Sequence, residues 1–206
     1  MKKTVLIGLI IFLIIIIPIS FFGCNYNTLV RLEERVKQAW AQVENQYQRR
    51  MDLIPNLIKT VQGAADFERT VLTEVTDARS KAGQMQLKAD DLTDPDKFAK
   101  FQQAQDQLSS AISRLLVVVE RYPELKSNQN FLELQAQLEG TENRISVERK
   151  NFNDAVQTYN SKVRSFPINL VAGIFGFKQM EYFKGREGSD RPPDVEFEFN
   201  KKEEKK

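Results

Sequence analysis

The chain opens with a long apolar run. Lys2 and Lys3 precede an almost unbroken stretch of apolar residues from Thr4 to Cys24. As a helix this stretch would be about 31 Å long at 1.5 Å per residue, close to the roughly 30 Å thickness of a hydrocarbon core. The apolar region of a secretory signal is shorter, at roughly 7 to 15 residues. The pattern therefore predicts that residues 1–24 form a transmembrane anchor, in contact with membrane lipid through residues 4–24.

Beyond residue 24, apolar residues recur in polar segments at alternating steps of three and four, the period of helices packed along one another. Four such series, called seams below, follow one another along the chain. Their members are Leu29, Val36, Trp40, Val43 and Tyr47; Leu57, Val61, Ala64, Glu68, Val71, Val75, Ala78, Ala82 and Met85; Phe98, Phe101, Gln105, Leu108, Ile112, Leu115, Val119 and Tyr122; and Phe131, Leu134, Leu138, Thr141, Ile145, Glu148, Phe152, Ala155 and Tyr159. No segment shows the period-2 alternation of a half-buried strand, so the predicted fold class is all-α.

The later breaks between seams carry helix-terminating and helix-starting residues. The residues from Asp94 to Asp96 combine a capping carboxylate with proline at the first helical position, which predicts the start of the third helix. Pro123 is expected to end the third helix, and either Ser127 or Asn128 to cap the fourth. Pro167 is expected to end the fourth, since proline lacks an amide proton and disfavours helical geometry in the residue before it.

The first break, from Asp52 to Pro55, is compatible with a tight reversal or with a kink in one long helix. Four seams of similar length favour the reversal. Helices joined by short loops lie antiparallel, which predicts an up-and-down four-helix bundle over residues 25–183, with long helices of about 45 Å.

In this topology the fourth helix returns to the membrane surface. The segment that follows it is the most apolar stretch outside the anchor, but it is too short to span a bilayer. Its candidate membrane-interface residues are Phe166, Ile168, Leu170, Val171, Ile174, Phe175 and Phe177. The segment can lie in the lipid interface, or it can fold back and close the open end of the bundle. Residues 184–206 are highly charged and are predicted to be a disordered tail.

The Lys and Arg residues on the two sides of the apolar run, Lys2 and Lys3 against Arg31, Arg35 and Lys37, do not decide its orientation. The short basic start before the apolar run is the order used by exported proteins, so we expect a single-pass protein of the bacterial cell membrane with the N-terminus inside and the bundle outside. Cys24 allows an alternative, because a small residue before a cysteine suits lipoprotein processing. Phe21 stands where such processing usually has a Leu-like residue, so both an inert thiol and a lipidated Cys24 remain open.

Composition excludes several kinds of site. The 30 basic and 28 acidic residues give a net charge of +2, a balance that argues against nucleic-acid binding. The chain has no histidine, the commonest metal ligand and acid/base group, and no cysteine beyond Cys24. We therefore predict no catalytic residues, no metal site and no cofactor.

A polar cluster next to the first break is a candidate partner-binding site. Its members are Arg49, Arg50, Asp52 and Asn56, which the reversal would place at the end of the bundle farthest from the membrane. The alternative is local stabilisation, in which the arginines meet the last carbonyls of the first helix and Asp52 caps the second.

Glu68 and Glu148 occupy seam positions where an apolar residue is expected. Paired carboxylates are the minimum equipment of a glycosidase, which makes a hydrolase a remote hypothesis. The alternative is that these polar residues fix the register of the helices. Trp40 and Tyr47, one heptad apart, are predicted to lie in the core.

Three blocks of the chain resemble the LemA family of bacterial membrane proteins. They are residues 26–30 continuing to 39–57; residues 144–149 with the pairs Phe152-Asn153 and Tyr159-Asn160; and residues 175–177 with the pair Tyr182-Phe183. The resemblance implies one amino-terminal membrane segment, a four-helix up-and-down bundle and no established catalytic activity. Cys24 departs from the family pattern.

These observations favour a non-enzymatic, membrane-anchored interaction or scaffold protein of the bacterial cell envelope, with an unidentified envelope protein as its partner. The alternative is an extracytoplasmic sensor that holds a small ligand within the bundle and signals through a partner. A hydrolase that uses Glu68 or Glu148 is the third hypothesis.

Overall fold

A computed structural model describes residues 2–63 and 67–185, and between residues 2 and 22 it describes the side chains of Leu9 and Phe12 only. The all-α prediction is confirmed for these residues. Their elements are α1 (Lys2–Gln62), α2 (Arg69–Gln84), the 3-10 helix η1 (Ala89–Thr93), α3 (Pro95–Val119), α4 (Pro123–Lys126), α5 (Gln129–Arg164) and α6 (Ile168–Phe175).

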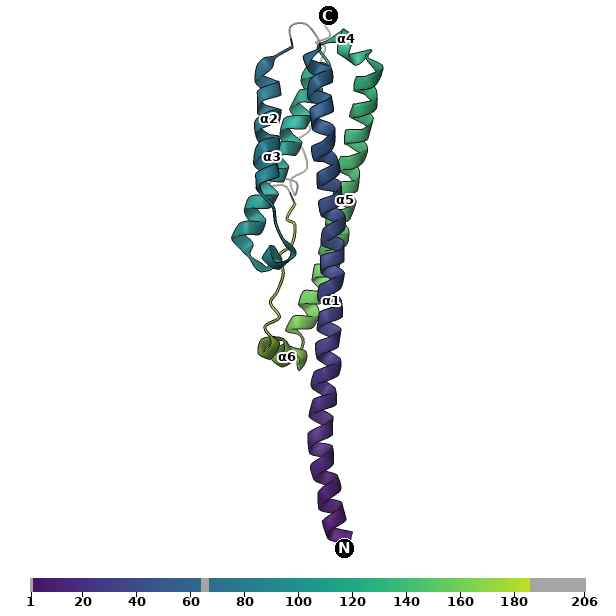
Figure 1. The fold of residues 1–206 in the computed structure, drawn as a ribbon, viewed down its shortest axis with the longest axis vertical. Coiled ribbons are helices and arrows are strands. Elements are labelled where there is room, and N and C mark those ends of the chain that lie inside the picture. The colour runs from purple at the N-terminus through teal and green to yellow at the C-terminus, as the bar shows by residue number, and fades with distance from the viewer. Residues whose placement is uncertain (1, 64–66, 186–206) are drawn as a thin grey trace, which may run out of the picture.

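The helices form a long rod around α1, which at 1.5 Å per residue is about 90 Å long (Figure 1). α5 runs antiparallel to α1 and packs along it, while α2 and α3 form a second antiparallel pair beside them. α6 lies at the end of the rod where α5 finishes. The N-terminal part of α1 continues beyond α6, away from the other helices.

The predicted reversal at the first break is wrong, because α1 passes through Pro55 and ends only at Gln62. Proline has no amide proton, so the carbonyl oxygen of Met51 lacks the donor that residue 55 would supply in a regular helix. The Nε of Arg79 on α2 donates to this oxygen at 3.2 Å. A donor from a neighbouring helix thus satisfies the carbonyl that Pro55 leaves free.

The prediction of one helix along the whole second seam is also wrong, because α1 ends at Gln62 and α2 begins at Arg69, both within that seam. Leu57 and Val61 are buried on α1, whereas Val71, Val75, Ala78 and Ala82 are buried on α2. The chain turns between them, and Ala64 lies outside the described residues. The other seams are largely buried as predicted, with Trp40 and Tyr47 in the core.

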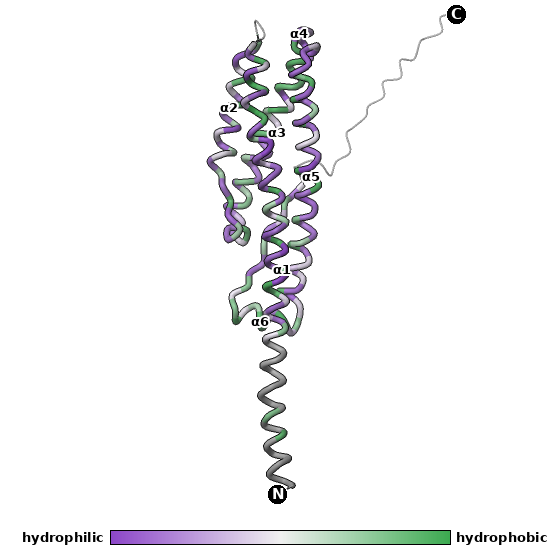
Figure 2. The backbone as a smooth tube through the Cα atoms, turned by 45° about the vertical axis from the view of Figure 1, so that its right-hand side comes forward, coloured by the Kyte–Doolittle hydropathy of each residue, from purple (hydrophilic) through white to green (hydrophobic). Residues whose placement is uncertain are grey.

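The apolar core is divided into two clusters, and hydrophobic and polar residues alternate along the helices that build it (Figure 2). The first cluster includes Tyr47, Phe101 and Ile145, and the second includes Ile54, Leu108 and Leu138. Between these positions each helix has one buried polar residue: Arg50 on α1, Gln105 on α3 and Thr141 on α5. A buried polar layer therefore crosses the rod between the two clusters.

The ends of α3, α4 and α5 lie near the predicted capping residues and prolines. The carboxylate of Asp94 caps α3 by accepting hydrogen bonds from the amides of Asp96 and Lys97, both at 3.1 Å. Asn128 caps α5, while Pro123 starts the short α4 after α3 has ended. α5 ends at Arg164, shortly before Pro167.

Within the described residues, no helix has an apolar stretch that qualifies as a candidate membrane span. Most side chains of the predicted anchor, residues 4–24, are outside the described set, as is the predicted tail from residue 186 onward.

Candidate functional site

The buried polar layer is centred on Arg50, whose side chain is 1% exposed. Its Nη1 donates to the hydroxyl of Ser109 at 2.6 Å and to the carboxylate of Glu142 at 2.9 Å, and its Nη2 donates to Oε1 of Gln105 at 2.5 Å. The guanidinium also lies over the ring of Tyr47, 5.2 Å from its centroid. Arg50 therefore links α1 to α3 and α5 in the middle of the rod.

A second arginine joins the same three helices nearby. Arg149 on α5 donates from Nε to the hydroxyl of Tyr47 at 2.7 Å and from Nη2 to Asp106 on α3 at 3.0 Å. Burial raises the pKa of the Tyr47 hydroxyl, and the two arginines oppose that shift. The hydroxyl therefore stays protonated at neutral pH.

These contacts correct the predicted partner-binding cluster. Arg50 lies in the core and cannot meet a partner at the surface, whereas Arg49, Asp52 and Asn56 are exposed on α1. Asp52 lies inside α1, so it caps no helix, and it accepts a hydrogen bond from Gln48 at 2.8 Å. None of the four residues is at the end of the rod, because α1 continues to Gln62. A docking role for the three exposed residues stays a prediction.

The sequence held a signal for the burial of Arg50. The first seam continues from Tyr47 through Arg50, Ile54, Leu57 and Val61 with the same alternating steps of three and four. That continuation indicates one helix through Pro55, with Arg50 on its buried face.

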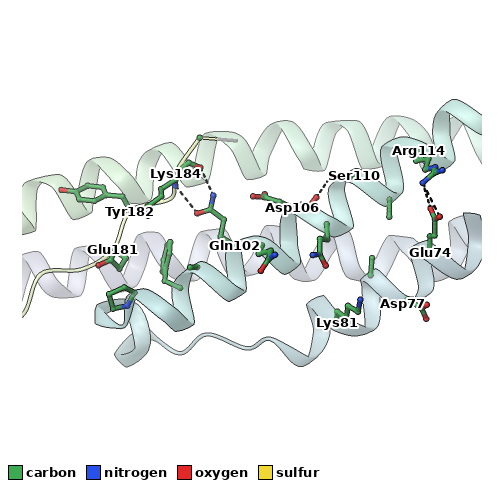
Figure 3. Close-up of a pocket in the computed structure, with 18 residues that line it drawn as sticks. Glu74, Asp77, Lys81, Gln102, Asp106, Ser110, Arg114, Glu181, Tyr182 and Lys184 are labelled. Carbon is green, nitrogen blue, oxygen red and sulfur yellow. Dashed lines mark hydrogen bonds and ion pairs between the residues drawn. The ribbon is translucent and has the colours of Figure 1, made fainter. Parts of the chain in front are cut away.

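A groove of about 990 Å³ opens between α2, α3 and the extended segment that follows α6 (Figure 3). Its α2 side carries Glu74, Asp77 and Lys81, and its α3 side carries Gln102, Gln103, Asp106, Gln107, Ser110 and Arg114. Arg114 pairs with Glu74 across the groove at 3.3 Å. The groove is thus lined mainly by charged and amide side chains.

The extended segment, residues 178–185, forms one edge of the groove and is held by side-chain amides. Asn160 on α5 bonds both the carbonyl and the amide of Met180, at 2.8 and 2.9 Å. Asn153 on α5 makes the same pair of bonds to Phe183, at 3.0 and 2.9 Å. Gln102 on α3 does so with Lys184, at 2.8 and 3.2 Å.

The spacing of this amide ladder matches the two backbones it joins. Asn153 and Asn160 are about 10.5 Å apart along a helix, and Met180 and Phe183 are about 10 Å apart in an extended chain. Sequence reasoning missed the ladder. The available signal was the repeat of asparagine after the core residues Phe152 and Tyr159, one heptad apart.

The two glutamates of the hydrolase hypothesis are not brought together as a pair by any contact among the described residues. Glu68 is the exposed N-cap of α2, not a seam residue, and lies 3.4 Å from Arg121. Glu148 on α5 accepts from Asn151 at 3.0 Å. Nor do three or more Cys, Asp or Glu side chains gather as a possible metal site anywhere in the described chain.

The residues predicted at the membrane interface divide between two faces of α6. Ile168 and Val171 are buried in the first core cluster and close the end of the rod, as one of the two alternatives expected. Leu170, Ile174 and Phe175 are exposed, as is Phe166 before α6, while Phe177 is half-buried. Gly176 ends α6 with a positive φ of 78°, a conformation that favours glycine.

Comparison with known proteins identifies the relatives of this chain. The LemA family profile matches residues 39–197. The chain is similar to magnetosome protein MamQ 2 of Paramagnetospirillum magneticum, with 29% identity over 184 residues, 82% of this chain and 68% of that protein. It is 27% identical to magnetosome protein MamQ of Magnetospirillum gryphiswaldense over the same shares. It is 25% identical to protein LemA of Metamycoplasma hominis, over 86% of this chain and 78% of that protein. The chain belongs to the LemA family.

Proposed function

We propose that this protein is a non-enzymatic scaffold that is anchored in the bacterial cell membrane and holds a partner protein against its helical rod. Residues 4–24 cross the membrane once, with the N-terminus inside and the rod outside. The helices α1, α2, α3 and α5 act together as a four-helix bundle. Membership of the LemA family and similarity to the MamQ proteins support membrane association.

The groove between α2 and α3 is the observation that carries the scaffold proposal. Its walls come from α2, α3 and residues 181–185, and α2 and α3 lie on the far side of α6 from the N-terminal continuation of α1 (Figure 1). Asp77, Lys81, Gln103 and Gln107 line it without a side-chain hydrogen bond or ion pair to other described residues. Charged and amide groups at an open groove can match the charges and hydrogen-bonding groups of a polar protein surface.

The groove is tested by site-specific crosslinking in intact cells. We place a photoreactive amino acid at Gln103 or Asp77 in the groove, and at Val147, which is exposed on α5 and does not line the groove. The two groove positions should give an adduct of the same mass that Val147 does not give. A Gln107→Trp variant should remove the adduct without lowering the melting temperature. Identical adducts from all three positions would contradict the groove as the partner site.

The anchor and its sidedness need a separate measurement. In a Cys24→Ser background, we introduce Ser189→Cys and treat intact cells with a membrane-impermeant thiol reagent. Labelling in intact cells is expected, and labelling only after lysis would place the rod inside. Incorporation of a fatty-acid analogue that is lost in Cys24→Ser would instead support the lipoprotein alternative, in which Cys24, exposed with a free thiol, carries the anchor.

A second candidate function is a sensor, favoured by the size of the groove. Its volume of about 990 Å³ lies within the range of roughly 300 to 1,000 Å³ common for small-molecule sites. A saturable rise in melting temperature with one metabolite, abolished by Gln107→Trp, would support this function over the scaffold.

A further inference from the structure

Among the described residues, an exposed apolar surface on and beside α6 lies outside the groove and the polar layer. We call it the α6 patch, and it comprises Tyr26, Phe166, Leu170, Ile174 and Phe175. Their exposed fractions are 39%, 81%, 56%, 68% and 52%. Large apolar side chains gathered in this way on a protein surface mark a contact with another apolar phase.

The patch exists because α6 is apolar on both faces. The helix contains no charged residue, and its inner face is already used to close the first core cluster through Ile168, Val171 and Ala172. Packing against the rod therefore explains only half of its apolar residues. The outer face needs a second explanation.

Ring contacts connect the patch to the start of the rod. The ring of Tyr26 on α1 lies 4.8 Å from that of Phe175 and 5.7 Å from that of Phe177, measured between centroids. Tyr26 is two residues, or about 3 Å of helix, beyond Cys24. A bilayer that contains residues 4–24 therefore has its surface at the level of α6.

The charges that flank α6 fit an anionic lipid surface. From Lys162 to Lys178 the chain has three basic residues, Lys162, Arg164 and Lys178, and no acidic residue. Arg164 and Lys178 are exposed. Basic residues beside exposed apolar and aromatic side chains are the composition of a segment that binds at the membrane interface.

We propose that the α6 patch is a second membrane contact, which inserts its outer apolar side chains into the interface of an anionic bilayer. This inference rests on the proposed anchor at residues 4–24. Because α1 is one helix from Lys2 to Gln62, the rod shares the tilt of the anchor. Contact through α6 on one side of α1 then fixes both that tilt and the rotation of the rod, and so the direction in which the groove faces.

The test compares two positions of equal exposure in the full-length chain. In a Cys24→Ser background, Ile174→Cys on α6 and Val117→Cys on α3 carry an environment-sensitive fluorophore; the native side chains are 68% and 69% exposed. The protein is placed in nanodiscs that contain phosphatidylglycerol. A lipid-borne quencher should quench the Ile174 probe roughly threefold more than the Val117 probe, and aqueous iodide should show the reverse preference.

Each other outcome counts against a defined part of the inference. If the protein enters the nanodiscs but iodide quenches both probes equally, the α6 contact is wrong while the anchor stands. If the protein does not enter nanodiscs, the anchor itself is wrong. If the Ile174 probe is shielded from both quenchers and its shielding grows with protein concentration, a second copy covers the patch and lipid does not.

The role of charge is tested with a variant that keeps the patch intact. Replacing Lys162, Arg164 and Lys178 by Gln should lower lipid quenching of the Ile174 probe by roughly half, as should replacing phosphatidylglycerol by phosphatidylcholine. Unchanged quenching in both cases would overturn the preference for anionic lipid. Circular dichroism of each variant establishes that the helices are retained.

Discussion

The Nε of Arg79 on α2 lies 3.2 Å from the carbonyl oxygen of Met51 on α1 and donates a hydrogen bond to it. Met51 is four residues before Pro55, so its carbonyl has no donor within α1. The bond supplies that donor and ties α2 to α1. It explains how a helix continues through a proline that the sequence presents as a possible reversal.

We expect the stabilising effect of Arg79 to depend on Pro55. Arg79→Met should lower the free energy of unfolding by about 1.5 kcal/mol, because the Met51 carbonyl loses its donor. In a Pro55→Ala background the amide of residue 55 replaces that donor, and the same change should cost less than about 0.5 kcal/mol. Urea unfolding in detergent, followed by circular dichroism, measures both values. Equal costs in the two backgrounds would refute the compensation.

Arg50 and its neighbour Arg49 should respond very differently to the same substitution. Arg50→Ala removes a buried guanidinium that bonds three side chains, and should destabilise the rod by about 3 kcal/mol. Arg49 is exposed, so Arg49→Ala should change stability by no more than about 0.5 kcal/mol. Thermal unfolding of the two variants makes the comparison, and similar melting temperatures would argue against the buried layer.

The amide ladder should require a donor as well as an acceptor. Asn160→Asp keeps an oxygen that can accept from the Met180 amide but loses the Nδ2 that donates to its carbonyl. We expect a loss of about 2 kcal/mol and faster trypsin cleavage after Lys178 and Lys184. Asn151→Asp, at an exposed position of the same helix, is the control and should leave the cleavage rate unchanged. Equal cleavage rates in the two variants would contradict the ladder.

The stability of the rod should fall in alkaline solution through Tyr159. Burial raises the pKa of Tyr159 to about 12, and Glu33 adds to this shift. The unfolded chain loses this proton near pH 10, before the folded protein does. The contribution of Tyr159 to the free energy of unfolding is therefore fully present below about pH 10 and is lost as the pH rises towards 12. Tyr159→Phe should flatten the fall in melting temperature over this interval, and an identical profile in wild type and variant would contradict the assignment.

Features that depend on local patterns could be predicted from the order of residues alone. The heptad spacing identified the helical class and most of the buried residues, including Trp40 and Tyr47, because burial of one helix face imposes that period. The capping chemistry of Asp94 and Asn128 located helix starts, because a cap is satisfied within three residues of itself. The apolar segment that became α6 was recognised from composition, and so was its capacity to close the rod.

Contacts between distant parts of the chain settle where the chain reverses and which groups bond the buried polar residues. The Met51 carbonyl that Pro55 leaves free is bonded by Arg79, which is 28 residues from Met51 in sequence. The burial of Arg50 depends on Gln105, Ser109 and Glu142, which two other helices supply. The amide ladder likewise requires Asn153 and Asn160 to meet a backbone that returns from α6. A local pattern can place such a residue on a buried helix face, but it does not identify the partner, because each feature is stable only when a distant part of the chain provides the matching hydrogen-bonding group.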